Sequence, residues 1–134
     1  MSGPEVAVGA VVVHDGSLLL VRRGHGPAAG EWSVPGGRIE WGETCAEAVV
    51  REVQEETGLE CVCGEMLGWV EVIDDDHHFV ILDFVATVLE HGVPVAGDDA
   101  AGVRWVPVHD VLGLNLVDGL AEFLHDQGIL DAFT

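Results

Sequence analysis

The stretch that decides the fold is "GGRIEWGETCAEAVVREVQEETGL", from Gly36 to Leu59. Thr44 and Glu47 form an S/T-x-x-E capping box, and Gly58 supplies a C-terminal stop, so the spacing predicts a helix over residues 45–57. Six glutamates fall within the seventeen residues 40–56. Like charges packed this closely repel one another, so their presence here needs a physical explanation.

The predicted helix carries its acids on one side. With about 100° of rotation per residue, Glu52, Glu55 and Glu56 share an arc of about 100°. This arc is expected at the edge of an apolar stripe that faces the core, where the wall of a cleft would be. The stripe comprises Ala46, Val49, Val50, Val53 and Thr57.

The opposite side of the helix is predicted to face solvent, with Glu47, Arg51 and Gln54 on it. Arg51 is four residues from both Glu47 and Glu55 and can pair with either. The crowded carboxylates have two remedies, because one of them can take a proton or a cation can bind. Hard divalent cations prefer oxygen ligands, and Mg²⁺ commonly combines carboxylates with substrate phosphates. The pattern alone leaves two interpretations open, a magnesium site or a solvated acidic face, and most acid-rich helices are of the second kind.

The segments around this helix predict strands. Residues 6–23 indicate a hairpin turning at Asp15-Gly16, residues 59–73 one or two strands, residues 77–90 a long central strand, and residues 103–108 a further strand. The chain then ends in a helical region in which Leu116, Leu120 and Leu124 recur every four residues. The fold class is α/β (α+β): an α/β/α sandwich with a mixed β-sheet and helices on both faces.

Composition narrows the class of protein. The chain has 134 residues, of which 49% are hydrophobic, and this favours one globular domain. No apolar run approaches the roughly 20 residues that span a bilayer, and the start lacks a basic signal region, so we expect a cytoplasmic protein with no membrane contact. The net charge of −19 repels a phosphate backbone, so no nucleic-acid partner is expected. Three cysteines without a signal sequence argue against a disulfide framework.

The spacing from Gly37 onward resembles the signature box of the Nudix hydrolases. That box reads G-x5-E-x7-R-E-U-x-E-E-x-G-U, with U aliphatic, and every position matches through Leu59. The preceding "WSVPGG" also looks like the lead-in of the family. The resemblance implies one Nudix domain over residues 1–134, which cleaves a nucleoside diphosphate linked to a moiety X. Its partner is then a nucleotide-derived small molecule, and the chain is a monomer or homodimer.

The resemblance also implies roles for residues of the box. Glu52, Glu55, Glu56 and the backbone carbonyl of Gly36 are the implied ligands of Mg²⁺, with Mn²⁺ as the other candidate ion. Glu43 supports the geometry and Arg51 orients the carboxylates. These five side chains, Glu43, Arg51, Glu52, Glu55 and Glu56, make up the expected catalytic set.

Residues outside the core of the box complete the candidate site. Arg22, Arg23 and Arg38 are candidates for phosphate contacts, because an arginine binds phosphate through two N–H groups at once. Their alternative is pairing with the abundant surface acids. Gly37 and Asp99 are assigned to substrate binding and Asp98 to the metal. Asp98 and Asp99 lie in the predicted loop before residues 103–108. In related proteins this loop supplies a metal ligand or a general base, and the general base here is Glu52, Asp98 or Asp99. For both aspartates the alternative is a simple turn.

Three functions remain open. The first expectation is hydrolysis of ADP-ribose or a related nucleotide sugar to AMP and a phosphorylated product. The chain lacks the extra N-terminal strands of some dimeric ADP-ribose enzymes. It also carries acids near Asp75 and Asp76 where those enzymes have a proline. The alternative is therefore a mutator-type pyrophosphatase that removes oxidised nucleoside triphosphates. A sensor domain without catalysis is less favoured, because all four fixed glutamates of the box are present.

Overall fold

The structure is a computed structural model that describes residues 3–26, 28–90 and 92–130. Strands are the commonest regular elements of the chain, with one long helix in the middle and helical segments near the C-terminal end. In chain order the elements are β1 (Glu5–Val11), β2 (Val13–His14), β3 (Ser17–Arg23), β4 (Trp32–Ser33), β5 (Gly36–Arg38), α1 (Cys45–Thr57), β6 (Cys61–Ile73), β7 (His78–Val88), β8 (Ala100–Pro107), the 3₁₀ helix η1 (Val108–Gly113) and α2 (Leu120–Asp126).

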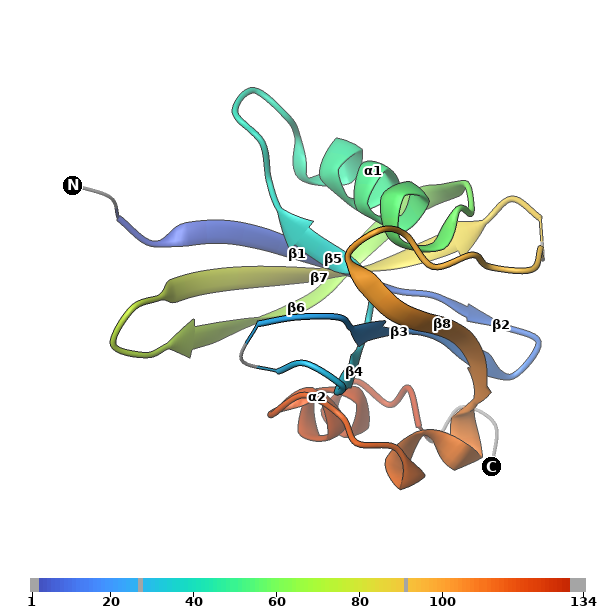
Figure 1. Ribbon diagram of the computed structural model, residues 1–134. Helices are drawn as coiled ribbons and strands as arrows, with labels where there is room; N and C mark the ends of the chain where they lie inside the picture. The colour runs from blue at the N-terminus through green and yellow to red at the C-terminus, as the bar shows by residue number, and fades with distance from the viewer. Residues whose placement is uncertain (1–2, 27, 91, 131–134) are drawn as a thin grey trace.

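The strands form two four-stranded sheets. The first sheet has the order β5-β1-β7-β6, in which β1 and β7 are parallel and the other neighbours are antiparallel. In the second sheet, β3 pairs antiparallel with β2, β4 and β8. Helix α1 lies on one side of the strands and α2 on the other (Figure 1). The predicted class, with mixed strand directions and helices on both faces, is confirmed, although the strands divide into two sheets rather than one.

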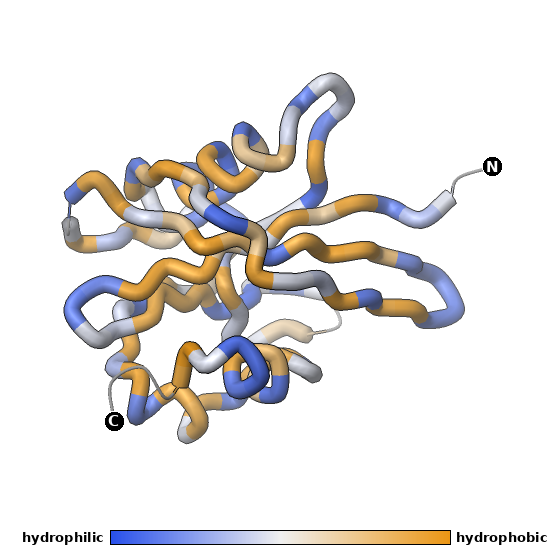
Figure 2. The backbone as a smooth tube through the Cα atoms, turned by 180° about the vertical axis from the view of Figure 1, so that it is seen from behind, coloured by the Kyte–Doolittle hydropathy of each residue, from blue (hydrophilic) through white to orange (hydrophobic). Residues whose placement is uncertain are grey.

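Two apolar clusters fill the space between these layers. One joins α1 to the first sheet and includes Val8, Ala10, Val49, Val53 and Ala86. The other lies on the α2 side and includes Val11, Leu18, Leu20, Val106, Val111 and Leu124. Figure 2 shows the resulting pattern: the strands are largely hydrophobic, while the turn between β6 and β7 is hydrophilic.

The first predicted hairpin is shorter than expected. Asp15 and Gly16 have φ angles of 49° and 75°, which suit a two-residue hairpin turn, but only β2 and β3 pair across it. Strand β1 instead lies between β5 and β7. The reason is that β1 is buried on both faces, from Ala7 to Val11, and a strand of this kind belongs inside a sheet.

Helix α1 has the predicted bounds, Cys45–Thr57. The Thr44 hydroxyl accepts a hydrogen bond from Glu47 N at 3.1 Å, and the Glu47 carboxylate accepts one from Thr44 N at 2.9 Å. Gly58 ends the helix with a left-handed φ of 74°, and its N–H donates to Gln54 O. The capping box and the glycine stop therefore act as the sequence indicated.

The C-terminal region is less helical than predicted. Leu120 and Leu124 are buried in α2, but Leu116 precedes this helix and forms an isolated parallel bridge with Trp32. The four-residue recurrence therefore extends beyond the helix that it indicated. No helix within the described ranges is long and apolar enough to cross a membrane.

Replacing Thr44 with Ala tests the capping box. Thr44 is exposed, so the substitution removes the hydrogen bond to Glu47 N with little loss of packing. We expect the free energy of unfolding to fall by about 1 kcal/mol in urea titrations. Thr44→Ser keeps the hydroxyl and should keep most of the stability. Equal stability of Thr44→Ala and wild type would show that the box contributes nothing.

Candidate active site

Arg51 lies at the centre of an acidic cluster formed by Glu43, Glu52 and Glu55. Its Nε and Nη2 donate to the two oxygens of Glu43, at 2.7 and 2.9 Å. Its Nη1 donates to Glu52 Oε1 at 2.6 Å and lies 3.3 Å from Glu55 Oε2. The Arg51 side chain is only 22% exposed, so the prediction that it faces solvent is wrong. One guanidinium therefore contacts several carboxylates at once, and hydrogen bonds to Glu43 and Glu52 hold the pKa of Arg51 above its ordinary value.

Arg51 also fixes the loop that precedes the helix. Its Nη2 donates to the carbonyl oxygen of Arg38 at 3.0 Å. The Glu43 carboxylate accepts a further hydrogen bond from Glu40 N at 3.0 Å. Hydrogen bonds from Arg51, and then from Glu40 N, lower the pKa of Glu43 to about 2. Glu43 is therefore an ionised clamp that joins the loop to the helix.

Glu52 and Glu56 point into the protein rather than along the edge of its buried face. Ala48, Val49, Val53 and Thr57 are the buried residues of α1. On the helical wheel Glu52 and Glu56 lie between them. Ala46 and Val50, predicted to face the core, are exposed. The apolar pattern misplaced the inward face because two of its members are acids, which a hydrophobic pattern counts as solvent-facing.

Burial shifts the acidity of both inward carboxyls. Desolvation raises the pKa of Glu52, although its bond to Arg51 opposes the shift. Desolvation raises the pKa of Glu56 to about 7, against the hydrogen bond from Gly36 N and the nearby charge of Arg23. That bond is short, with Gly36 N donating to Glu56 Oε1 at 2.6 Å. It ties the last turn of the helix to the start of β5, so two predicted site residues are in direct contact.

Gly37 lies directly beside the carboxylate of Glu52. A Cβ added at Gly37 would overlap the carboxylate of Glu52, and its three nearest atoms would all belong to that group. The described side chains form no ready-made cage of three converging metal ligands. Glu52 and Glu56 nevertheless fit a hard divalent cation, because such ions prefer carboxylate oxygens. Beside Glu52 there is a space that a side chain at Gly37 would fill. In this structure Arg51 provides the positive charge.

The other predicted arginines lie apart from this hub. Arg22 donates to Ala101 O at 3.2 Å, and its guanidinium lies 5.8 Å from the centre of the Trp32 ring. The Arg38 side chain pairs with Glu5 at 3.0 Å and covers Phe79. Arg23 is exposed, yet its charge reaches Glu56. Phosphate contact by these three residues stays a prediction, and Arg23 lies best for it.

The loop before β8 meets the end of α1. Val95 N donates to Thr57 O at 2.8 Å and Gly97 N donates to Glu56 O at 3.2 Å, so Asp98 follows directly after a contact with the helix. Asp98 and Asp99 are both exposed. Asp99 lies 3.3 Å from His25 rather than against the glutamates. The fold therefore brings this loop to the site, while the metal and substrate roles of the two aspartates stay predictions.

Two residues of interest carry little sequence signal. Arg104 places its guanidinium 5.7 Å from the Trp32 ring, where Arg22 also lies. Asp83 is buried within β7. A lone acid within the apolar run "HFVILDFVATV" was the available signal for Asp83. For Arg104 nothing in the local pattern distinguishes it from any other charge on a strand.

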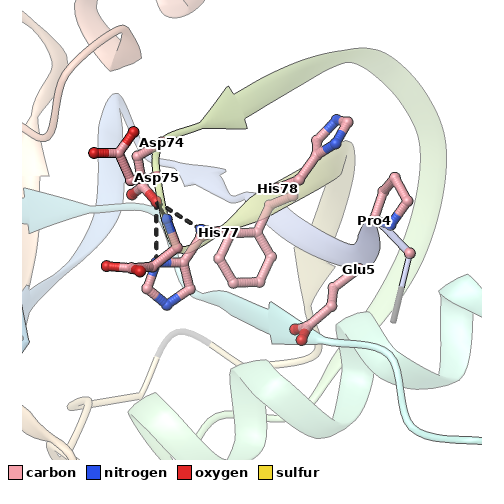
Figure 3. A pocket seen from close by; sticks show the side chains of 9 residues that line it. Pro4, Glu5, Asp74, Asp75, His77 and His78 are labelled. Carbon is pink, nitrogen blue, oxygen red and sulfur yellow. Dashed lines mark hydrogen bonds and ion pairs between the residues drawn. The ribbon is translucent and has the colours of Figure 1, made fainter. Parts of the chain in front are cut away.

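A hollow of about 300 Å³ lies at the far end of the first sheet, beside the turn between β6 and β7 (Figure 3). Asp74 in this turn accepts hydrogen bonds from Asp76 N and His77 N. The hollow is lined by Gly3, Pro4, Glu5, Asp74, Asp75, Asp76, His77, His78 and Phe79. The Asp74 carboxylate is thus occupied in holding the turn, and no three acidic or histidine groups of the described chain converge as metal ligands here.

Comparison with known proteins agrees with the fold. The NUDIX domain family matches residues 3–127. A protein of Methanocaldococcus jannaschii named ADP-ribose pyrophosphatase is 41% identical over 110 residues, which cover 81% of this chain and 64% of that protein. The chain thus spans slightly less than two thirds of that relative's length. Together with the box residues clustered around α1, these matches show that the chain belongs to the Nudix hydrolase family.

Solved structures give the same fold over almost the whole chain. The MutT protein of Methanosarcina mazei Go1 is 26% identical, with a TM-score of 0.84 over 98% of this chain and 99% of that one. The NUDIX domain of Shewanella oneidensis NrtR, solved in complex with ADP ribose, is 26% identical, with a TM-score of 0.79 over 96% of this chain and 88% of that one.

The raised pKa of Glu56 predicts a pH-dependent penalty in metal-free protein. The pKa in the folded state is about 7, against an ordinary value of 4.5, so the native state holds the extra proton. The contribution of Glu56 to stability is therefore greatest below pH 4.5, and it is lost as pH rises to 7. Glu56→Gln removes this titration. We expect the variant to gain roughly 2–3 kcal/mol over wild type on going from pH 4.5 to 8, in urea titrations with chelator present.

Glu60→Gln is the matched control, since Glu60 is exposed just beyond the end of α1. It should follow the wild-type pH profile. A constant difference between Glu56→Gln and wild type across this range would contradict the burial of an ionisable Glu56.

Proposed function

We propose that this chain is a magnesium-dependent pyrophosphohydrolase that cleaves a nucleoside diphosphate linked to a second moiety. The observation that carries the proposal is the arrangement of Glu52 and Glu56 on the inward face of α1, with Glu55 beside them and Gly36 bonded to Glu56. Inward-facing acids are costly for a fold unless a cation or proton compensates them. A divalent cation bound by these carboxylates would offset that cost.

Glu52, Glu55, Glu56 and the Gly36 carbonyl would hold the ion, which supplies charge neutralisation for the diphosphate and activation of the attacking water. Arg51 and Glu43 act as positioning residues, because their paired hydrogen bonds keep the loop and helix in one arrangement. Arg23 contributes a positive charge beside Glu56 for a phosphate group. Glu52, with its raised pKa, is the first candidate for the general base, and Asp98 and Asp99 are the others.

Reaction at the diphosphate is in-line displacement by water. The water oxygen forms a bond to phosphorus, the bridging P–O bond breaks, and the base takes a proton from the water. For ADP-ribose the products are AMP and ribose 5-phosphate. ADP-ribose is the first candidate substrate because the Methanocaldococcus relative is named for that activity and the Shewanella domain was solved with that molecule bound.

Hydrolysis of ADP-ribose with Mg²⁺ is the direct test, with products separated by chromatography. Wild type should form AMP and ribose 5-phosphate, and Glu56→Gln should lose at least about a hundredfold in kcat. The screen includes nucleoside triphosphates, whose products would be a nucleoside monophosphate and pyrophosphate. That result would select the second candidate substrate class.

Glu65→Gln is a suitable control, because Glu65 is exposed on β6. It should retain wild-type activity. Binding of ADP-ribose without turnover by wild type would identify a sensor domain. Equal turnover by wild type and Glu56→Gln would contradict the proposed catalytic set.

A further inference from the structure

Asp83 is a buried acid that the proposed mechanism does not use. It lies in the middle of β7, the central strand that pairs with β1 and β6, and is only 6% exposed. Alternate residues of a strand point to opposite faces. Val8 and Ala10 of β1 belong to the cluster under α1, so Gly9 and its register partner Asp83 face the opposite side, toward the α2 layer. Asp83 is therefore separate from the carboxylates of α1.

Glycines flank Asp83 on both neighbouring strands. Its register partners are Gly9 on β1 and Gly68 on β6, so neither position places a side chain beside the carboxyl. A Cβ added at Gly9 would overlap Asp83 Oδ1 and would lie 3.3 Å from Val34 Cγ2. The carboxyl therefore leans over β1 and is next to Val34. The sheet leaves room for this acid without supplying a group that binds it.

No hydrogen bond or ion pair within the described residues involves Asp83, and desolvation raises its pKa to about 6. A buried carboxyl without a partner is costly to the fold. In the described part of the chain, His78 Nε2 is the one fully buried side-chain nitrogen or oxygen that makes no hydrogen bond. The oxygens of Asp83 therefore keep a small contact with solvent, through which a ligand atom can reach them.

Val34 links Asp83 to the proposed site. It belongs to the segment Trp32–Gly36. At one end of this segment Trp32 lies beside the guanidiniums of Arg22 and Arg104. At the other end Gly36 N is bonded to Glu56. A nucleotide whose phosphates reach Glu56 can therefore place its nucleoside along this segment, on the side where Asp83 lies. Charge repulsion keeps the phosphates away from Asp83, so in this placement a group that reaches the carboxyl would belong to the nucleoside.

We propose that Asp83 is a specificity-determining residue, whose carboxylate accepts a hydrogen bond from the exocyclic amino group of the substrate's base. The surroundings, Val34 and the glycines, suit a flat base better than a hydroxyl-rich sugar, and Trp32 offers an aromatic ring in the same segment. Amino-bearing bases such as adenine are then preferred over keto analogues such as hypoxanthine. This inference rests on the proposed function only for the position of the phosphates.

Equilibrium binding of AMP and IMP tests the inference without requiring turnover. With Mg²⁺ present, wild type should bind AMP roughly ten- to a hundredfold more tightly than IMP, as expected for a hydrogen bond to a charged acceptor. In Asp83→Asn the ratio should fall to near one, because an amide can accept from an amino group or donate to a keto group. The same change should appear in KM for ADP-ribose and its hypoxanthine analogue, with kcat little altered.

Thermal unfolding at pH 8 separates recognition from a structural role. Asp83→Asn removes a buried unpartnered charge, so its melting temperature should equal or exceed that of wild type. Glu65→Gln should change neither the AMP to IMP ratio nor the melting temperature.

A lower melting temperature for Asp83→Asn, an unchanged ratio, or the absence of nucleotide binding would each overturn the inference. A preference for AMP that Asp83→Asn abolishes, in a protein that hydrolyses nothing, would refute the proposed function and leave this inference standing.

Discussion

The structure depends on the compensation of like charges along one helix. Glu52, Glu55 and Glu56 lie within about one turn of each other, and two of them are partly buried, where water screens their charges less. Arg51 supplies the opposing charge from the same helix. It forms a paired contact with Glu43, so the compensation also fixes the loop that leads into the helix. Arg51 thus compensates charge on α1 and, through Glu43 and the carbonyl oxygen of Arg38, also fixes the position of β5.

Backbone hydrogen bonds also hold α1 in place, in addition to the contacts of Arg51. Gly36 N holds Glu56 from β5, and the carbonyl oxygens of Glu56 and Thr57 accept hydrogen bonds from the loop before β8. Glycine is required at closely packed points of this arrangement, because a side chain at Gly37 would overlap Glu52 and one at Gly97 would overlap Glu55 O. The site is therefore assembled from the helix and two separate parts of the chain, β5 and the loop before β8, whose backbones approach the helix closely.

Much of this arrangement could be predicted from the sequence, because local chemistry determines it. The capping box and Gly58 correctly predicted the bounds of α1. The spacing of the Nudix signature box correctly indicated that Arg51, Glu43 and Glu52 lie together. The failures arose where tertiary contacts decide. Ala46 and Val50 are exposed, because acids rather than these two residues occupy part of the inward face of α1. Strand β1 does not pair in the predicted hairpin, because a strand buried on both faces lies inside a sheet. Asp83 could not be interpreted from a strand pattern, since its burial follows from the register with Gly9 and Gly68.

Titration calorimetry with Mg²⁺ tests the central claim most directly, because the claim is that the inward glutamates of α1 are retained to bind a divalent cation. The account predicts saturable Mg²⁺ uptake by wild type, in the presence of a non-hydrolysed ADP-ribose analogue, that is lost in Glu56→Gln and retained in Glu60→Gln. Absence of uptake by wild type, or equal uptake by wild type and Glu56→Gln, would contradict it.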